Sequence, residues 1–156
     1  MFDYDLLEWS EFLSYVATVI GIPMAIYIFA HQERKERRIE QQEIYDKLMG
    51  HYTEIQNKLF EHPELDIHDR PLEDPEDYRR QYILYEMVAS LFERSFILLH
   101  GEENPEYARM WNSWVDYIKY WLSQENFRQA LPKLMEGEDP DFVAYMSKIS
   151  GLKLVA

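Results

Sequence analysis

The chain has no cysteine among its 156 residues. This absence excludes a disulfide framework, a thiolate metal site and a thiol nucleophile. None of the five histidines follows a glutamate at the Glu-x-x-His spacing of di-iron bundles. The sequence also contains no H-E-x-x-H, phosphate-loop or G-x-S-x-G motif. We therefore predict that the protein is not an enzyme and needs no cofactor.

Basic residues are scarce as well. The chain has 16 Lys and Arg against 29 Asp and Glu, for a net charge of −13, and residues 39–156 alone carry −11. Neutralising nucleic-acid phosphates needs a basic surface, so we expect no nucleic-acid partner. An acidic domain instead suits a protein partner with a basic face.

Charge is absent altogether from residues 12–30, with the sequence FLSYVATVIGIPMAIYIFA. As a helix this stretch is about 28 Å long, close to the hydrocarbon thickness of a bilayer. Trp9 and Tyr15 lie near one end and Tyr27 near the other, where an aromatic belt would place them. The stretch predicts a transmembrane helix. A cleaved signal peptide is the alternative, and it would need a basic start, whereas this start is acidic.

The flanking bases set the expected orientation. All four lie after the apolar stretch, and no Lys or Arg precedes it: Arg34, Lys35, Arg37 and Arg38. The positive-inside rule then predicts a single-pass protein with residues 1–11 outside and the C-terminal domain in the cytosol. Residues 31–44 would form a basic, then polar stalk, and residues 45–156 the cytosolic domain.

Two features of the predicted span point to roles in addition to anchoring. Ala17, Gly21 and Ala25 form a row of small residues spaced by four, which allows close approach of a second helix. Pro23 lacks an amide donor and crowds the carbonyl of Val19, so the helix should kink there.

The remaining pattern predicts an all-α protein, in which the transmembrane helix continues into a small helical bundle. The first helix should end at His62-Pro63, and its apolar stripe from Tyr45 to Leu59 should pack on later helices. Three Asx-Pro pairs should open helices at residues 75, 105 and 140. The first of these should stop at Gly101 and the last at Gly151. Ser123 should cap a helix over 124–136 that breaks at Pro132.

The loop over residues 62–75 contains a weak candidate metal site. Its members are two imidazoles and two carboxylates: His62, Asp66, His68 and Asp69. Such groups can hold a divalent ion. The alternative is turn formation, in which the aspartates bond nearby backbone amides.

A possible ligand pocket is formed by charged and aromatic residues of the second and third helices. The candidates are Glu86, Glu93, Arg94, Trp111 and Trp114. Glu86 and Glu93 are seven apart and share a helix face, and the tryptophans could stack on a ligand ring. The alternatives are structural: a salt-bridge network to the third helix through Arg109 or Lys119, and core packing of the tryptophans.

Several strings taken together resemble a family of small uncharacterised bacterial proteins with one membrane span and a helical cytosolic domain. They are TVIGIPMAI, HPELDI, LFERSFILL, the spaced W-x-x-W-x-x-Y-I of residues 111–118, NFRQAL and DPDFVAYM. The resemblance covers nearly the whole chain and implies the same topology. It implies no catalytic residue.

Two functions fit these observations. The first is a membrane-anchored, non-catalytic interaction or scaffold protein that presents its helical domain to a protein partner, or to itself as a homo-oligomer, at the cytosolic face. The second is a ligand-gated membrane effector or sensor, in which a small cytosolic molecule binds the helical domain.

Overall fold

The computed structural model describes residues 6–156, and within the first helix it describes the side chains of residues 9, 11, 14–16 and those from 18 onward. The described chain is all-helical, without a strand. Its elements are α1 (Leu6–Glu61), the short 3-10 helix η1 (Pro63–Leu65), α2 (Pro75–Leu99), α3 (Pro105–Leu122), α4 (Glu125–Leu134) and α5 (Pro140–Ser150). The all-α prediction is confirmed.

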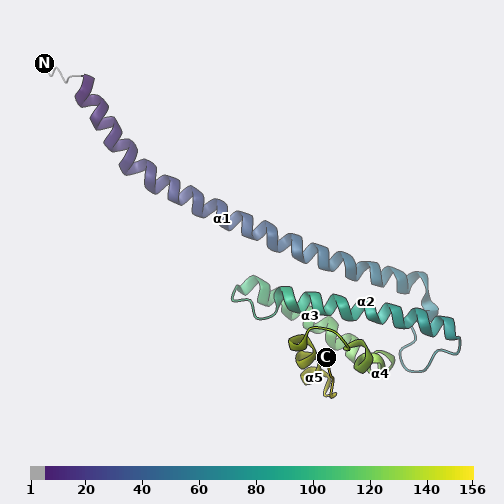
Figure 1. The fold of residues 1–156 in the computed structure, drawn as a ribbon. Coiled ribbons are helices and arrows are strands. Elements are labelled where there is room, and N and C mark those ends of the chain that lie inside the picture. Colours follow the sequence, from purple (N-terminus) through teal and green to yellow (C-terminus); the bar gives the residue numbers. More distant parts are fainter. Residues whose placement is uncertain (1–5) are drawn as a thin grey trace. The chain divides into compact units, whose positions relative to one another are not determined.

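The chain forms two compact units, residues 1–43 and residues 44–156. Helix α1 contributes to both (Figure 1). Its N-terminal part makes up the described portion of the first unit. The second unit contains the last part of α1 and every later element.

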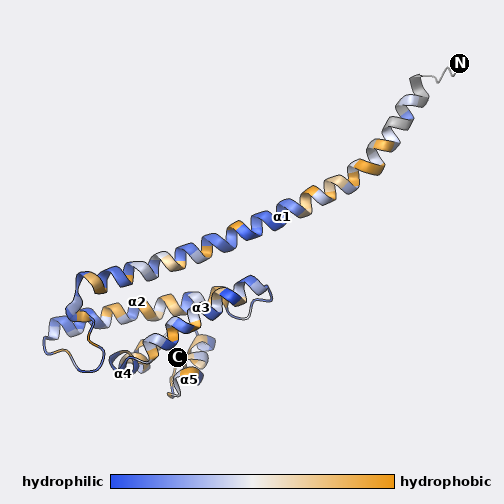
Figure 2. Ribbon diagram, turned by 180° about the vertical axis from the view of Figure 1, so that it is seen from behind, coloured by the Kyte–Doolittle hydropathy of each residue, from blue (hydrophilic) through white to orange (hydrophobic). Residues whose placement is uncertain are grey.

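Within the first unit, α1 changes character along its length. Figure 2 shows an apolar segment followed by a strongly hydrophilic one. The helix continues through Pro23 without a break. Thr18 donates its hydroxyl to the carbonyl oxygen of Ser14 at 2.8 Å, which satisfies one of the few polar side chains of the apolar segment within the helix itself.

The second unit is organised around α2, which runs between the last part of α1 and the shorter helices α4 and α5 (Figure 1). Its core is rich in aromatic side chains. The largest fully buried residues include Trp114, Trp121, Phe92, Phe127 and Phe142. Many of these rings meet edge to face, the arrangement that aromatic quadrupoles favour.

The predicted stripe of α1 packs into this core. Leu48, Tyr52 and Ile55 are buried. The ring of Tyr52 lies 6.0 Å from that of Trp114 and 4.5 Å from that of Tyr117, measured between centroids. The stripe therefore joins α1 to α3, as its spacing predicted.

The helix boundaries follow local signals. Asp74, Asn104 and Asp139 each accept an amide hydrogen bond from the first turn of the helix they precede, and a proline occupies the first helical position in each case. Gly151 closes α5 at a φ of 70°, in the left-handed region that favours glycine. Gly101, just after α2, has a φ of 79°. These predicted starts and stops are confirmed.

Two boundary predictions are wrong. Ser123 ends α3, where its hydroxyl donates to the carbonyl of Tyr120, and Gln124 precedes α4 instead. Helix α4 also runs through Pro132 to Leu134. The missing amide donor falls in the last turn, close to where the ladder of hydrogen bonds ends in any case, so its loss does not break the helix.

Candidate functional site

The apolar segment of α1 is the most unusual surface of the first unit. It is long and apolar enough to cross a membrane, and its most hydrophobic 18-residue stretch contains no buried residue. Val19 and Phe29 are each 70% exposed, and Ile26 is 65% exposed. The core helix of a water-soluble protein would bury such a stretch. An exposed apolar surface of this size is typical of a site that contacts a membrane or another protein.

The basic cluster that follows is exposed and partly compensated. Arg34, Lys35, Arg37 and Arg38 all lie on the surface. A nitrogen of Arg37 lies 2.7 Å from a carboxylate oxygen of Glu33, one helical turn earlier. Three of the four cations have no ion pair in the described part of the chain.

The small-residue row is described only in part. The side chain of Ala17 lies outside the described residues, while Gly21 and Ala25 are exposed. A Cβ added at Gly21 would meet nothing within 4 Å. The helix surface at Gly21 is therefore open to a neighbour, although the row itself remains a prediction.

The five predicted pocket residues lie in three separate places. Glu86 and Arg94 line a groove of about 330 Å³ between α1 and α2, together with Ile55 and Met87. Glu93 instead accepts the backbone amide of Asp139 at 2.6 Å, at the start of α5. Trp114 is fully buried and Trp111 nearly so. The tryptophans thus serve as core residues, the alternative that their spacing favoured.

The predicted salt-bridge network to α3 is wrong. Across the described residues, no ion pair joins Glu86, Glu93 or Arg94 to Arg109 or Lys119. Glu86 and Arg94 are exposed, so water solvates their charges and neither needs an ion-pair partner.

The four loop residues predicted as weak metal ligands separate into different contacts. His62 Nδ1 lies 3.0 Å from a carboxylate oxygen of Glu64, and His68 Nε2 lies 2.7 Å from one of Asp66. Among the described residues no group of three or more His, Asp or Glu is arranged to hold a metal ion.

The same loop is held by two amide side chains that the sequence did not single out. Gln81 Nε2 donates to the carbonyl oxygens of Leu65 and Ile67, each at 2.8 Å. Asn126 Nδ2 donates to the carbonyl oxygens of Ile67 and Arg70, also at 2.8 Å. We call Gln81 and Asn126 the amide clamp, because together they tie the loop to α2 and α4.

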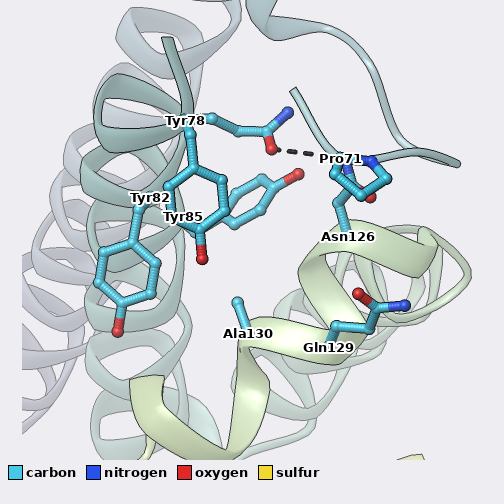
Figure 3. Close-up of a pocket in the computed structure, with 8 residues that line it drawn as sticks. Pro71, Tyr78, Tyr82, Tyr85, Asn126, Gln129 and Ala130 are labelled. Carbon is cyan, nitrogen blue, oxygen red and sulfur yellow. Dashed lines mark hydrogen bonds between the residues drawn. The ribbon is translucent and has the colours of Figure 1, made fainter. Parts of the chain in front are cut away.

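The amide clamp borders a cleft of about 240 Å³ between α2, the loop and α4 (Figure 3). Tyr78, Tyr82 and Tyr85 line it from α2, while Gln129 and Ala130 face them from α4. Burial raises the pKa of the Tyr85 hydroxyl, so this group stays protonated at neutral pH. The cleft is smaller than most ligand pockets, which enclose about 300–1,000 Å³.

A third cleft is larger, at about 670 Å³, and lies between the end of α1, η1 and the end of α3. Phe60 and Tyr120 line it and are 88% and 54% exposed. Gln124 and Trp121 also line it, and both are buried. A cleft lined by two exposed aromatic rings suits contact with another molecule. Catalysis would need a nucleophile placed beside a base.

One carboxyl group in the second unit is perturbed. Partial burial, together with the nearby carboxylate of Glu93, raises the pKa of Glu138 from 4.5 to about 7. Glu138 lies in the turn that connects α4 to α5, and Glu93 binds the next residue of that turn. This arrangement fastens the start of α5 to α2 and requires no ligand.

Comparisons with protein-family models, with curated proteins and with solved structures give no match to this chain.

Proposed function

We propose that this chain is a single-pass membrane protein whose helical domain lies in the cytosol and binds a protein partner there without catalysing a reaction. The observation that carries the proposal is the exposed apolar segment of α1. An 18-residue apolar stretch with no buried residue would be unstable in water, and lipid satisfies it.

The orientation is supported by the charges around the segment. Arg34, Lys35 and Arg38 follow it with no ion pair in the described chain, and no base precedes it. Positive charges are retained on the cytosolic side during insertion. The domain after Arg38 is then cytosolic, in agreement with its lack of cysteine.

The interaction role is supported by the surface of the second unit. Apolar side chains stay exposed on α2 and at the end of α1, among them Ile83, Met87, Ile97 and Phe60. In the part of the chain that the structure describes, no group of three or more His, Asp or Glu is arranged to hold a metal ion. Exposed apolar groups bordered by charges are typical of protein-binding surfaces.

Fractionation of cells tests the anchoring. The full-length protein is expected in the membrane pellet after an alkaline wash, while Ile20→Arg combined with Ile26→Arg should shift it to the soluble fraction. Each arginine costs about 2.5–3.5 kcal/mol at the centre of a span, enough to oppose insertion. The matched control is Ile20→Leu with Ile26→Leu. A wild-type protein that the wash releases would contradict the proposal.

Cross-linking in intact cells tests the interaction role. A defined adduct on the second unit is expected, with another protein or with a second copy. Absence of every adduct from the wild-type protein in its membrane would contradict an interaction function.

A ligand-gated effector is the second candidate, and the cleft beside Phe60 and Tyr120 favours it. Its volume of about 670 Å³ falls within the range of small-molecule sites. A ligand bound there should raise the melting temperature of the full-length protein in a screen of small molecules. Phe60→Ala should remove that shift, and a screen without any shift would reject this candidate.

A further inference from the structure

The surface of α2 that faces away from the core carries an ordered pattern. We call it the α2 outer face. Apart from the adjacent Glu86 and Met87, its residues are spaced by three or four positions: Ile83, Glu86, Met87, Ser90, Arg94 and Ile97. At 100° per residue these positions fall on one side of the helix. Ile83 is 43% exposed, Met87 46% and Ile97 57%, and Ser90 is half-buried. The buried residues of α2 occupy the opposite side.

The pattern is nearly symmetric about Ser90. Ile83 and Ile97 lie seven residues before and after it, and Glu86 and Arg94 lie four residues before and after it. If two α2 helices cross antiparallel at Ser90, Ile83 of each meets Ile97 of the other. A small residue at the crossing point lets the two helices approach closely.

The charges match under the same operation. In the antiparallel crossing, Glu86 of each copy faces Arg94 of the other, so the interface contains two opposite-charge pairs. In a parallel crossing, Glu86 would face Glu86 and Arg94 would face Arg94. Across the described residues, neither side chain has an ion-pair partner within its own chain, so both are available.

The groove beside this face provides further apolar surface. It is about 330 Å³, lies between α1 and α2, and is lined by Ile55 and Leu91 as well as by Ile83 and Met87. Glu86 and Arg94 stand in its lining. An apolar strip with charged residues along it is the usual composition of a helix–helix interface.

We propose that the α2 outer face binds a second copy of this chain, with the two α2 helices antiparallel about a two-fold axis at Ser90. The inference rests on the proposed function in one respect: it names the protein partner of the cytosolic domain. A two-fold interface must be complementary to itself, and the symmetry about Ser90 meets that condition. An unrelated partner would not require it.

Charge exchange between copies tests the proposal in the full-length protein. In the dimer, Glu86→Arg alone sets two arginines against each other at both charge pairs, and Arg94→Glu alone sets two glutamates against each other there. Each variant should associate with itself about tenfold more weakly than wild type does, since two attractive pairs become repulsive. In a mixed dimer of the two variants both pairs are again of opposite charge. The introduced arginine faces the introduced glutamate at one pair, and the native Glu86 faces the native Arg94 at the other.

The readout is co-purification of two differently tagged chains from the same membranes. We expect little co-purification for either variant with itself, and recovery toward the wild-type level when the two variants are co-expressed. Glu102→Arg, an exposed change in the loop before α3, is the control for added charge alone. A mixed pair no better than either variant alone would overturn the proposal, as would single variants indistinguishable from wild type.

Cysteine cross-linking tests the direction of the helices, because the chain has no cysteine of its own. Under mild oxidation, an Ile83→Cys chain should form a disulfide with an Ile97→Cys chain. Neither should do so efficiently with itself, since in the antiparallel dimer the two copies of one position lie about 21 Å apart along the helix axis. A strong disulfide of Ile83→Cys with itself would show parallel packing and overturn the proposal.

The same samples separate this inference from the anchoring. Chains that stay in the washed membrane but show neither the mixed disulfide nor the charge-exchange recovery overturn the dimer and leave the anchoring intact. Chains that leave the membrane yet form the mixed disulfide overturn the anchoring and support the dimer.

Discussion

At the scale of single residues, the amide clamp is the feature with the clearest energetic role. Gln81 is buried, and its Nε2 serves two loop carbonyls. Asn126 adds two further donations to the same loop. Because a buried carbonyl without a partner is costly, these amides fix a loop whose own sequence, rich in Pro and Asp, forms only the short helix η1.

Replacing Gln81 by Leu should therefore lower the free energy of unfolding by about 1–3 kcal/mol, because it leaves the carbonyl of Leu65 without its donor and removes one of the two donors to the carbonyl of Ile67. Thermal unfolding followed by circular dichroism measures the change. Gln129→Leu is the matched control, since Gln129 is exposed and bonds only Glu125 within its own helix. Equal stability of the two variants would contradict the role of the amide clamp.

Glu138 should make stability depend on pH. Its pKa is about 7 in the folded protein, against 4.5 as the ordinary value. Below about pH 4.5 the group is protonated in both states. Between about pH 4.5 and 7 the unfolded chain releases the proton while the folded chain keeps it, so the free energy of unfolding falls as pH rises. The loss is about 1 kcal/mol, because solvent screens a carboxyl that is only partly buried.

Glu138→Gln removes this titration, so its stability should rise relative to wild type at pH 8 and show a smaller slope between pH 4.5 and 7. Denaturant unfolding at a series of pH values measures the slope. Glu136→Gln is the control, since Glu136 is exposed two residues earlier. An unchanged slope for Glu138→Gln would show that other groups set the pH dependence.

At the scale of elements, Pro132 is the residue whose effect is most open to measurement. It lies inside α4 and is exposed, and the helix ends two residues later. Pro132→Ala restores an amide donor toward the carbonyl of Arg128 and should raise the free energy of unfolding by about 1 kcal/mol. Pro105→Ala is the control, because at the first helical position proline removes no hydrogen bond. Destabilisation by Pro132→Ala would contradict this account.

The helices could be predicted from the sequence where their signals are local. Asp74, Asn104 and Asp139 each stand before a proline that begins a helix, and the cap bonds only the next two or three residues. The spacing of the tryptophans in α3 likewise predicts that they are buried, because one face of the helix must pack on the core.

Contacts between distant segments could not be predicted in the same way. Asn126 and Ile67 are 59 residues apart, and nothing near either one indicates the bond between them. Glu86 and Glu93 share a helix face by spacing, yet only the position of α5 decides that Glu93 binds the amide of Asp139. Ser123 and Pro132 show the limit of local rules, since each residue type fits more than one place near a helix end.

At the scale of the whole molecule, an apolar helix segment is followed by an acidic helical domain with an aromatic core. In the proposed topology the apolar segment lies in lipid and the domain in water, and the boundary between them falls near the basic cluster that starts at Arg34. In that topology the helical domain is tethered to the membrane, and anchoring raises the local concentration of a second copy and favours weak association.

The most direct test of the central claim is the accessibility of single cysteines to a maleimide that does not cross membranes. Ser113→Cys, exposed on α3, should remain unlabelled in intact cells and become labelled after the membrane is opened. Asp3→Cys, before the span, should be labelled in intact cells. Labelling of Ser113→Cys in intact cells, or recovery of the wild-type chain in the soluble fraction, would contradict the proposed topology.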